Sequence, residues 1–328
     1  MVRASMSPDS LLSARGLTVS FGRRGKGSPL VAVDGVDIDV RPGEVLGLVG
    51  ESGCGKTTLG RTLLGQQPES AGSIHLANKL VSGMTARAAR MARRDIQFVH
   101  QDPGAALDPW WTIGSTLHES LIVGGVHDKA ERQQRIATML DAVGLDQTAL
   151  RRYPHEFSGG QQRRIGLART LILRPSIVIL DEPTSGLDLS VQANVLKLFL
   201  DMKERFGLTY IFISHDLSVV RRMCDRIMVM YLGRVVEEAA TKDIFERPVH
   251  PYTQALLGAA PRLDPDAVLK QQVLQGDPPS AASIPSGCRF APRCVHVVEQ
   301  CRAVDPRLVS LTPTHAAACR LVEPEAVR

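Results

Sequence analysis

The sequence predicts an α/β fold with a mixed β-sheet, an antiparallel β layer and a helical subdomain, followed by a small cysteine-rich domain. Strand-like and helix-like segments alternate from residue 45 to residue 230, which is the pattern of an α/β sheet. The run Ile177–Leu180 is entirely apolar, as in a parallel strand that is covered on both faces. A glycine-rich turn at residues 50–58 joins a strand-like segment to a helix-like one.

Size and charge limit the classes of protein to which the chain can belong. Its 328 residues, 44% apolar and 22% charged, suffice for a sizeable core and about two domains. No apolar stretch approaches the roughly 18 residues of a membrane span. Met1–Asp9 has no apolar signal core, so we expect a soluble cytoplasmic protein unless a partner recruits it. The net charge of +5 is mild and interleaved with acidic residues, and it indicates no nucleic-acid partner.

The first segments with a strand pattern lie before the glycine-rich turn. Leu17–Phe21 and Val31–Val40 alternate apolar and polar residues, and together they predict a small antiparallel layer. Phe21, at the end of the first segment, has two interpretations. It is either an ordinary core residue or an aromatic ring placed over an adenine base.

The glycine-rich turn has the residue types of a phosphate-binding loop. Val45–Val49 predicts a buried strand before the turn, and a helix pattern begins at Leu59 after it. Glycines allow the backbone N–H groups to point at phosphate oxygens, the lysine reaches the β- and γ-phosphates, and the following hydroxyl ligates Mg²⁺. We therefore expect a nucleotide to contact Gly50, Ser52, Gly53, Cys54, Gly55, Lys56, Thr57 and Thr58.

Two adjacent acidic residues follow the apolar run 177–180. Asp181 and Glu182 should lie at the carboxyl edge of the sheet, where ligands bind in α/β folds. Asp181 is the expected Mg²⁺ partner, and Glu182 is the expected general base for the water that attacks the γ-phosphate. A charged strand end is common in any protein, but this pair accompanies a phosphate loop.

Two further segments provide polar groups of the kind that bind phosphate. Ser158 can cap a helix that begins with two glycines, and its exposed N–H groups would make a second anion-binding helix end. This indicates a nucleotide shared between two copies of the chain. His215 follows the apolar segment 209–213, where it would either bond a γ-phosphate or serve as a structural histidine.

Taken together, these motifs resemble those of ABC transporter ATP-binding subunits over residues 11–262. The resemblance is carried, in chain order, by Gly50–Thr58, Gln101, Ser158–Gln162, Ile177–Glu182, Ser185–Asp188 and His215. It implies that two subunits enclose two ATP molecules. In that arrangement Ser158, Gly159, Gly160 and Gln161 of one subunit face the γ-phosphate that Lys56 of the other subunit holds.

The resemblance also implies roles for residues that the patterns alone leave open. Phe21 would stack on adenine, and Asp188 would lie at the dimer seam. Gln101 would sense Mg²⁺ and the γ-phosphate, and it would link them to the helical subdomain at about residues 104–165. The implied cofactors are ATP and Mg²⁺, with Mg²⁺ held by Thr57, Gln101 and Asp181.

A later segment, His250–Leu257, narrows the resemblance to importers of oligopeptides and dipeptides, a group that includes nickel importers. Pro251 has the position of a first helical residue, and the segment would lie outside the ATP site.

Residues 11–246 would form the nucleotide-binding domain and residues 247–328 an extension. The implied partners are a second ATPase subunit, two permeases and, through them, a solute-binding protein, at the cytoplasmic face of the inner membrane. Soluble ABC ATPases usually carry two cassettes or a coiled-coil insertion, and neither pattern is present.

Four of the six cysteines lie after residue 287, at spacings of 5, 6 and 17 intervening residues. Zinc ribbons usually have tighter pairs, and each of these cysteines has an arginine beside it that would lower the thiol pKa. Four buried free thiols are the simplest alternative. Similar domains of peptide-importer ATPases carry a 4Fe-4S cluster, and the resemblance implies one here, with zinc as the second choice. The ligands would be Cys288, Cys294, Cys301 and Cys319.

Overall fold

A computed structural model describes residues 10–22, 29–100, 103–259, 276, 279 and 284–322. The chain forms two compact units. Unit 1 contains residues 1–89 and 211–328, and unit 2 contains residues 90–210. The expected boundary of the nucleotide-binding domain at residue 246 is a different division, and it stays a prediction. None of the helices within the described ranges is both long and apolar enough to cross a membrane.

Unit 1 contains the expected antiparallel layer. Its strand order is β2-β1-β4-β5, with β1 at Leu12–Phe21, β2 at Leu30–Val40, β4 at Ala71–Leu76 and β5 at Lys79–Leu80. Alternate residues of β2 are buried, among them Val36 and Ile38, which are both 2% exposed. Strand β1 begins at Leu12, five residues earlier than predicted, because its bulge at Arg15 and Gly16 interrupts the alternation.

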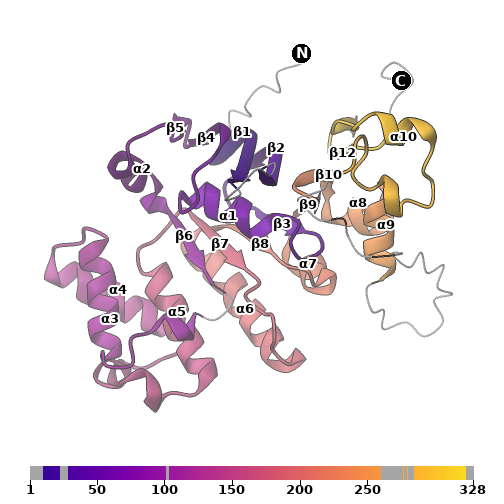
Figure 1. Cartoon of the computed structure of the whole chain (residues 1–328). Coiled ribbons are helices and arrows are strands. Elements are labelled where there is room, and N and C mark those ends of the chain that lie inside the picture. Colours follow the sequence, from indigo (N-terminus) through magenta and orange to yellow (C-terminus); the bar gives the residue numbers. More distant parts are fainter. Residues whose placement is uncertain are drawn as a thin grey trace. The chain divides into compact units, whose positions relative to one another are not determined.

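A second sheet in unit 1 carries the strand that leads into the phosphate loop. Strand β3 (Val45–Val49) pairs in parallel with β9 (Arg226–Tyr231). Strand β10 (Arg234–Ala240) pairs antiparallel with β9 and with β12 (His315–Ala317). Strand β11 (Val309–Thr312) pairs antiparallel with β12 and forms the edge of the sheet. Strands β10, β11 and β12 were not predicted from the sequence. The C-terminal region thus extends this sheet (Figure 1).

The helices that the structure describes within unit 1 are all short, and the one that follows the phosphate loop has nine residues. They are α1 (Lys56–Leu64), α7 (Leu217–Met223), α8 (Thr241–Glu246), α9 (Pro251–Gly258), α10 (Glu299–Ala303) and the 3₁₀ turn η5 (Ala291–Arg293). Pro251 is the first residue of α9, as expected, because proline has no N–H to leave unbonded there. The fully buried Glu237 accepts hydrogen bonds from the N–H groups of Val249 and His250, and its Oε1 lies 2.7 Å from Nε2 of His315. This carboxylate therefore ties α9 and β12 to β10.

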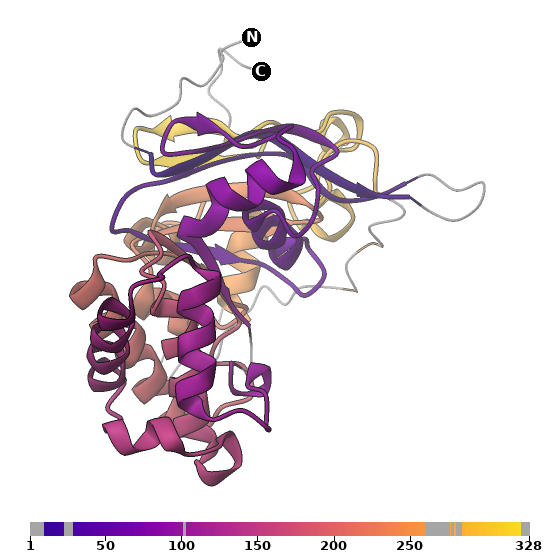
Figure 2. The ribbon, with the colours of Figure 1, turned by 90° about the vertical axis from the view of Figure 1, so that its left-hand side faces the viewer.

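Unit 2 holds the helical subdomain and the strand that ends in the two acidic residues. Strands β6 (Ile96–Val99) and β7 (Ile177–Asp181) are parallel, with Ile96 opposite Ile177. Helices α3 (Ile113–Val123), α4 (Lys129–Ala142) and α5 (Gly159–Leu171) pack against one another, and Figures 1 and 2 show them as one group. The other helical elements are α6 (Leu189–Phe206) and the 3₁₀ turns η1 (Arg93–Asp95), η2 (Gly104–Ala106), η3 (Gln147–Arg151) and η4 (Pro154–Glu156). Helix α2 (Ala86–Ala92) and strand β8 (Thr209–Ile213) each contain a boundary between the units.

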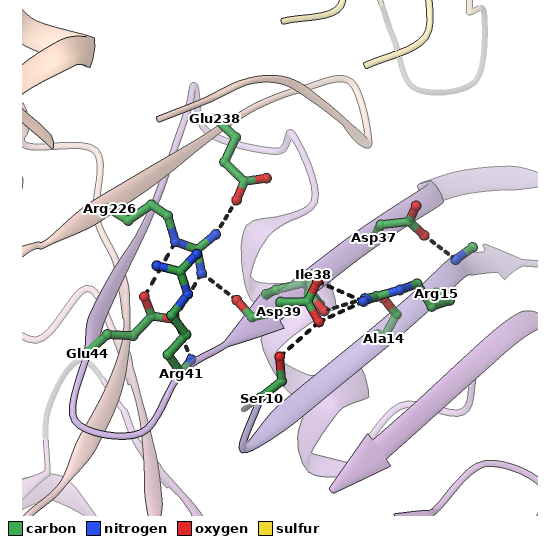
Figure 3. Close-up of polar contacts among 11 residues, drawn as sticks. Ser10, Ala14, Arg15, Asp37, Ile38, Asp39, Arg41, Glu44, Arg226 and Glu238 are labelled. Atoms are coloured by element: carbon green, nitrogen blue, oxygen red, sulfur yellow. Dashed lines mark hydrogen bonds and ion pairs between the residues drawn. The ribbon is translucent and has the colours of Figure 1, made fainter. Parts of the chain in front are cut away.

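An ion network joins the antiparallel layer to the central strands of unit 1 (Figure 3). The side chain of Arg226, 12% exposed, bonds the carboxylates of Glu44 and Glu238 and the backbone oxygen of Asp39. Asp39 in turn pairs with Arg15 at 2.7 Å. Because the guanidinium has three acceptors, little of its charge is left uncompensated in this half-buried position.

Candidate functional site

The phosphate loop lies between β3 and α1 of unit 1, and its three glycines differ in their surroundings. Gly50, Gly53 and Gly55 have φ values of 148°, 78° and 107°, which strain any residue with a side chain. A Cβ atom on Gly50 would lie 2.2 Å from the backbone oxygen of Met230, and one on Gly55 would lie 2.2 Å from that of Ala32. A Cβ on Gly53 would meet nothing within 4 Å.

The loop holds its lysine through backbone oxygens. Lys56 is 5% exposed, and its Nζ donates to the oxygens of Gly50 at 2.7 Å and Glu51 at 2.9 Å. Helix α1 begins at this lysine behind Gly55, which has no side chain to cap the first turn. The loop thus combines a cation with an uncapped helix N-terminus, the arrangement that suits an anionic phosphate.

Cys54 supplies a structural side chain to the loop. It is 4% exposed, and its Sγ lies 3.7 Å from Nζ of Lys56. Burial raises the pKa of the Cys54 thiol, although Lys56 acts in the opposite direction. At neutral pH the side chain is therefore a neutral packing group, and a nucleotide would meet the backbone of this residue.

His215 and Phe21 lie in unit 1, as the phosphate loop does. Ser52 belongs to that loop, and Thr57 and Thr58 are the second and third residues of α1. The Ser214 N–H donates to the backbone oxygen of Leu48 at 3.3 Å, which places the end of β8 beside β3. His215 follows directly and is exposed. Phe21 ends β1 and is 37% exposed. A large aromatic side chain with this exposure is not ordinary core, which leaves the adenine interpretation open.

The two acidic residues lie at the end of β7 in unit 2, as the sequence predicts. Asp181 is the last residue of the strand. Glu182 has φ = 50°, a left-handed conformation that is uncommon for residues other than glycine. Its backbone oxygen accepts from the Ser185 N–H at 3.1 Å and closes a turn. Strain of this kind is concentrated at functional sites.

A capping box opens α5 in the same unit. Ser158 Oγ accepts from the Gln161 N–H at 3.4 Å, and Gln161 Oε1 accepts from the Ser158 N–H at 3.0 Å. Gly159 and Gly160 follow, and a Cβ atom on either would meet nothing within 4 Å. The first turn of α5 is therefore bare on its glycine side, which leaves room for a ligand or a partner chain.

Asp188 caps α6 and precedes an exposed apolar side chain. Its Oδ1 accepts from the Val191 N–H and from the hydroxyl and N–H of Ser190, and these bonds hold the pKa of the Asp188 carboxyl below its usual range. Leu189 is 83% exposed. Leu189 was not singled out from the sequence, although an apolar residue directly after an N-cap aspartate was a usable signal.

Gln101, predicted to contact Mg²⁺, lies outside the described residues.

The four C-terminal cysteines line one small cavity that is partly open to solvent, together with His250, Phe290 and Arg320. Within the described ranges, no three His, Cys, Asp or Glu side chains form a group arranged to hold a metal ion. Burial raises the pKa of the Cys288, Cys294 and Cys319 thiols, that of Cys288 to about 11. The expectation that neighbouring arginines lower these values is therefore wrong.

The arginines next to two of the cysteines are used elsewhere. Arg289 bonds Asp34 and the backbone oxygen of Leu232, and Arg293 bonds Glu51 at 2.7 Å and 3.0 Å. Adjacent residues in this segment point in different directions, so the sequence neighbour of a thiol does not become its electrostatic partner.

Sequence reasoning also missed a contact between the C-terminal region and the phosphate loop. The Glu51 N–H donates to the hydroxyl of Tyr252 at 2.8 Å, and Arg293 pairs with the carboxylate of Glu51. Tyr252 belongs to the segment that we expected outside the ATP site, yet it touches the loop. No local pattern signals a contact between residues 201 positions apart.

Comparisons with known proteins agree with this architecture. The family model of ABC transporters matches residues 33–185, and that of the oligopeptide/dipeptide transporter C-terminal region matches residues 236–301. The dipeptide transport ATP-binding protein of Haemophilus influenzae is 44% identical over 313 residues, which are 94% of this chain and 96% of that protein. The di/tripeptide transport ATP-binding protein of Pseudomonas aeruginosa is 41% identical over 319 residues, 96% of this chain and 98% of that protein.

A solved structure with the same core is an ATP-binding cassette dimer in a post-hydrolysis state bound to ADP and Pi. It aligns with a TM-score of 0.61 and 26% identity, over 70% of this chain and 98% of that one. The fold, the phosphate loop and these matches show that the chain belongs to the ABC transporter family of ATPases. Within that family it belongs to the ATP-binding proteins that carry the oligopeptide/dipeptide transporter C-terminal region.

Proposed function

We propose that this chain is the ATP-hydrolysing subunit of a bacterial importer of dipeptides or oligopeptides. The observation that carries the proposal is the joint presence of the phosphate loop, with Lys56 held inside it, and the peptide-transporter C-terminal region. Relatives named for peptide transport that span nearly the whole chain support the substrate class. An importer of nickel or another small solute is the alternative within the same family.

In the proposed mechanism, the phosphate loop binds the triphosphate of ATP. Lys56 neutralises charge on the β- and γ-phosphates, and the N–H groups of the loop and of α1 donate hydrogen bonds to the phosphate oxygens. Phe21, exposed at the end of β1, stacks on the adenine ring. Mg²⁺ neutralises developing phosphate charge when it is bound, and the hydroxyl and carboxylate donors of Thr57 and Asp181, with the Gln101 amide, are hard oxygen ligands that suit it.

Glu182 is the general base, because it is the carboxylate that follows the strand-terminal Asp181. It takes a proton from the attacking water, and His215 hydrogen-bonds the γ-phosphate. Ser158, Gly159, Gly160 and Gln161 of one subunit contact the γ-phosphate held by the other. Asp188 lies at the seam of that dimer, where the exposed Leu189 supplies apolar contact area.

In this proposal the subunit is bound to its permeases at the cytoplasmic face of the inner membrane. The second ATPase is a paralogue or an identical copy, and two permeases receive the motion of the helical subdomain. Trp110 and Trp111, 86% and 41% exposed in unit 2, are large apolar side chains suited to a permease contact. An extracytoplasmic solute-binding protein delivers the peptide through the permeases.

The C-terminal region at residues 247–328 carries, in this proposal, a structural 4Fe-4S cluster held by Cys288, Cys294, Cys301 and Cys319. The support is that all four side chains line one cavity. Zinc is the second choice. Protein purified without oxygen should show the broad absorption near 400 nm of iron–sulfur thiolates, with stoichiometric iron and sulfide. Stoichiometric zinc, or no metal at all, would contradict the cluster.

The mechanism is tested with Glu182→Gln, which keeps the shape of the side chain and removes the base. The variant should bind ATP and accumulate as a closed, ATP-loaded dimer with its partner, whereas hydrolysis falls by at least about a hundredfold. Glu204→Gln is the matched control, because Glu204 is an exposed glutamate on α6 of the same unit. Normal turnover of Glu182→Gln would overturn the assigned base.

Transport is tested by purifying the tagged protein from native membranes in mild detergent and identifying its partners by mass spectrometry. Two permeases, a second ATPase and a peptide-binding protein are expected. Recovery with ribosomes or DNA from the soluble fraction alone would keep the ATPase and overturn transport.

A further inference from the structure

Glu51, the second residue of the phosphate loop, is held through all three of its polar groups. Its N–H donates to the hydroxyl of Tyr252 at 2.8 Å, and its backbone oxygen accepts from Nζ of Lys56 at 2.9 Å. Its carboxylate accepts two hydrogen bonds from Arg293, at 2.7 Å and 3.0 Å. The same backbone oxygen also accepts from the Cys54 N–H at 3.3 Å. Tyr252 and Arg293 come from the C-terminal region, whereas Lys56 and Cys54 belong to the loop.

The side chains of both C-terminal partners are buried. The side chain of Arg293 is 5% exposed, and its two parallel bonds to Glu51 set the orientation of the carboxylate as well as its position. Tyr252 is fully buried, with its ring centroid 4.6 Å from that of Tyr231 and 5.5 Å from that of Phe290. A rotation of either side chain would have to disturb this packing.

The segment Cys288–Cys294 makes a second link to the loop. Arg289 bonds the backbone oxygen of Leu232, and the neighbouring Gly233 N–H donates to the backbone oxygen of Cys54 at 2.9 Å. The cysteines at the two ends of the segment line the cavity instead. One short segment therefore contacts the phosphate loop directly through Arg293 and the four-cysteine cavity through its thiols, whereas Arg289 bonds the residue next to Gly233.

We propose that Arg293 and Tyr252 are positioning residues of the ATP site, which makes the C-terminal region a working part of that site. Lys56 is oriented by the backbone oxygens of Gly50 and Glu51, and the position of Glu51 is set by these two side chains. Loss of either contact lets the loop adopt other conformations. The apparent nucleotide affinity then falls in proportion to the fraction of molecules whose loop keeps the binding conformation. The inference rests on the ATP binding proposed above.

The test is the affinity for a fluorescent ATP analogue, measured with the full-length protein beside its steady-state ATPase kinetics. Arg293→Gln should raise Kd and KM at least about tenfold while kcat at saturating ATP changes by less than about threefold. Arg293→Lys should lie between Arg293→Gln and the wild type, because lysine keeps the charge but loses the paired hydrogen bonds. A structural residue with no positioning role would not produce this separation of KM from kcat.

Two further variants keep the inference falsifiable if Arg293→Gln folds poorly. Tyr252→Phe removes one oxygen from a packed ring and should weaken binding of the analogue severalfold. Glu51→Gln combined with Arg293→Gln should bind more tightly than Arg293→Gln alone, because no partly buried carboxylate is left without its cation. Arg247→Gln, which breaks an exposed pair with Asp243 in the same unit, should leave Kd unchanged.

The outcomes separate this inference from the proposed function. Wild-type affinity in both Tyr252→Phe and folded Arg293→Gln would overturn the positioning role and leave ATP binding intact. A wild-type protein that does not bind the analogue would overturn the proposed function and, with it, the positioning role.

Discussion

Replacing two glycines of the phosphate loop by alanine should have unequal effects, although both are in left-handed conformations. Gly53 has φ = 78° and open space where a Cβ would lie, so Gly53→Ala brings only the cost of the conformation, about 1–2 kcal/mol. Gly55 has φ = 107°, and its Cβ would lie 2.2 Å from the backbone oxygen of Ala32.

The clash at Gly55 cannot be relieved by a side-chain rotation. Ala32 belongs to β2, which is paired with β1, so the backbone of the loop or of the strand must move. Overpacking of this kind adds about 1–3 kcal/mol, and Gly55→Ala should therefore cost about 2–5 kcal/mol in total.

The assay is urea unfolding of both variants and the wild type, followed by circular dichroism and by binding of a fluorescent ATP analogue. Gly55→Ala should show the lower unfolding midpoint and the larger loss of affinity. Equal losses of unfolding free energy in the two variants would refute the reasoning, because backbone conformation alone would then explain both.

Three other predictions concern buried polar groups. Arg226→Met removes the cation beside the half-buried Glu238 and should cost about 3–5 kcal/mol of unfolding free energy in denaturant titrations. Burial already raises the pKa of the Glu238 carboxyl and Arg226 lowers it, so the loss should be smallest at acidic pH, where Glu238 is protonated, and should grow as pH rises. Tyr210→Phe deletes the buried hydroxyl that donates to the Phe199 backbone oxygen at 2.8 Å, and thermal unfolding should show a cost of about 1 kcal/mol. Cys54 should resist iodoacetamide in the native protein and react after unfolding, as followed by peptide mass spectrometry; rapid native labelling would contradict its raised pKa and burial.

The sequence predicted those features whose cause is local. Helix α6 is bounded by an aspartate that caps its start and a glycine in a left-handed conformation at its end, and both are local signals. The capping box at Ser158 was implicit in the serine and glutamine three residues apart. Strands β3, β7 and β8 were recognisable because buried parallel strands are apolar at nearly every position.

Features that depend on distant partners were not predictable in this way. Strand β10 carries Glu237 and Glu238 among apolar residues, and their burial depends on His315 and Arg226, which lie elsewhere in the chain. The thiol pKa values were misjudged because Arg289 and Arg293 turn away from the cysteines toward Asp34 and Glu51. Sequence adjacency gives no direction to a side chain in an irregular segment.

The sequence by itself determined the class of this protein, because a phosphate loop, its flanking strand and helix, and the strand-terminal acids are encoded in short contiguous patterns. Only the tertiary structure decided that the C-terminal region is joined to that loop. The Arg293–Glu51 pair spans 242 positions, and such a pair forms only because chain folding brings its two ends together. Local patterns specify elements through nearby backbone and side-chain interactions, whereas contacts between distant elements follow from how the apolar faces of those elements pack.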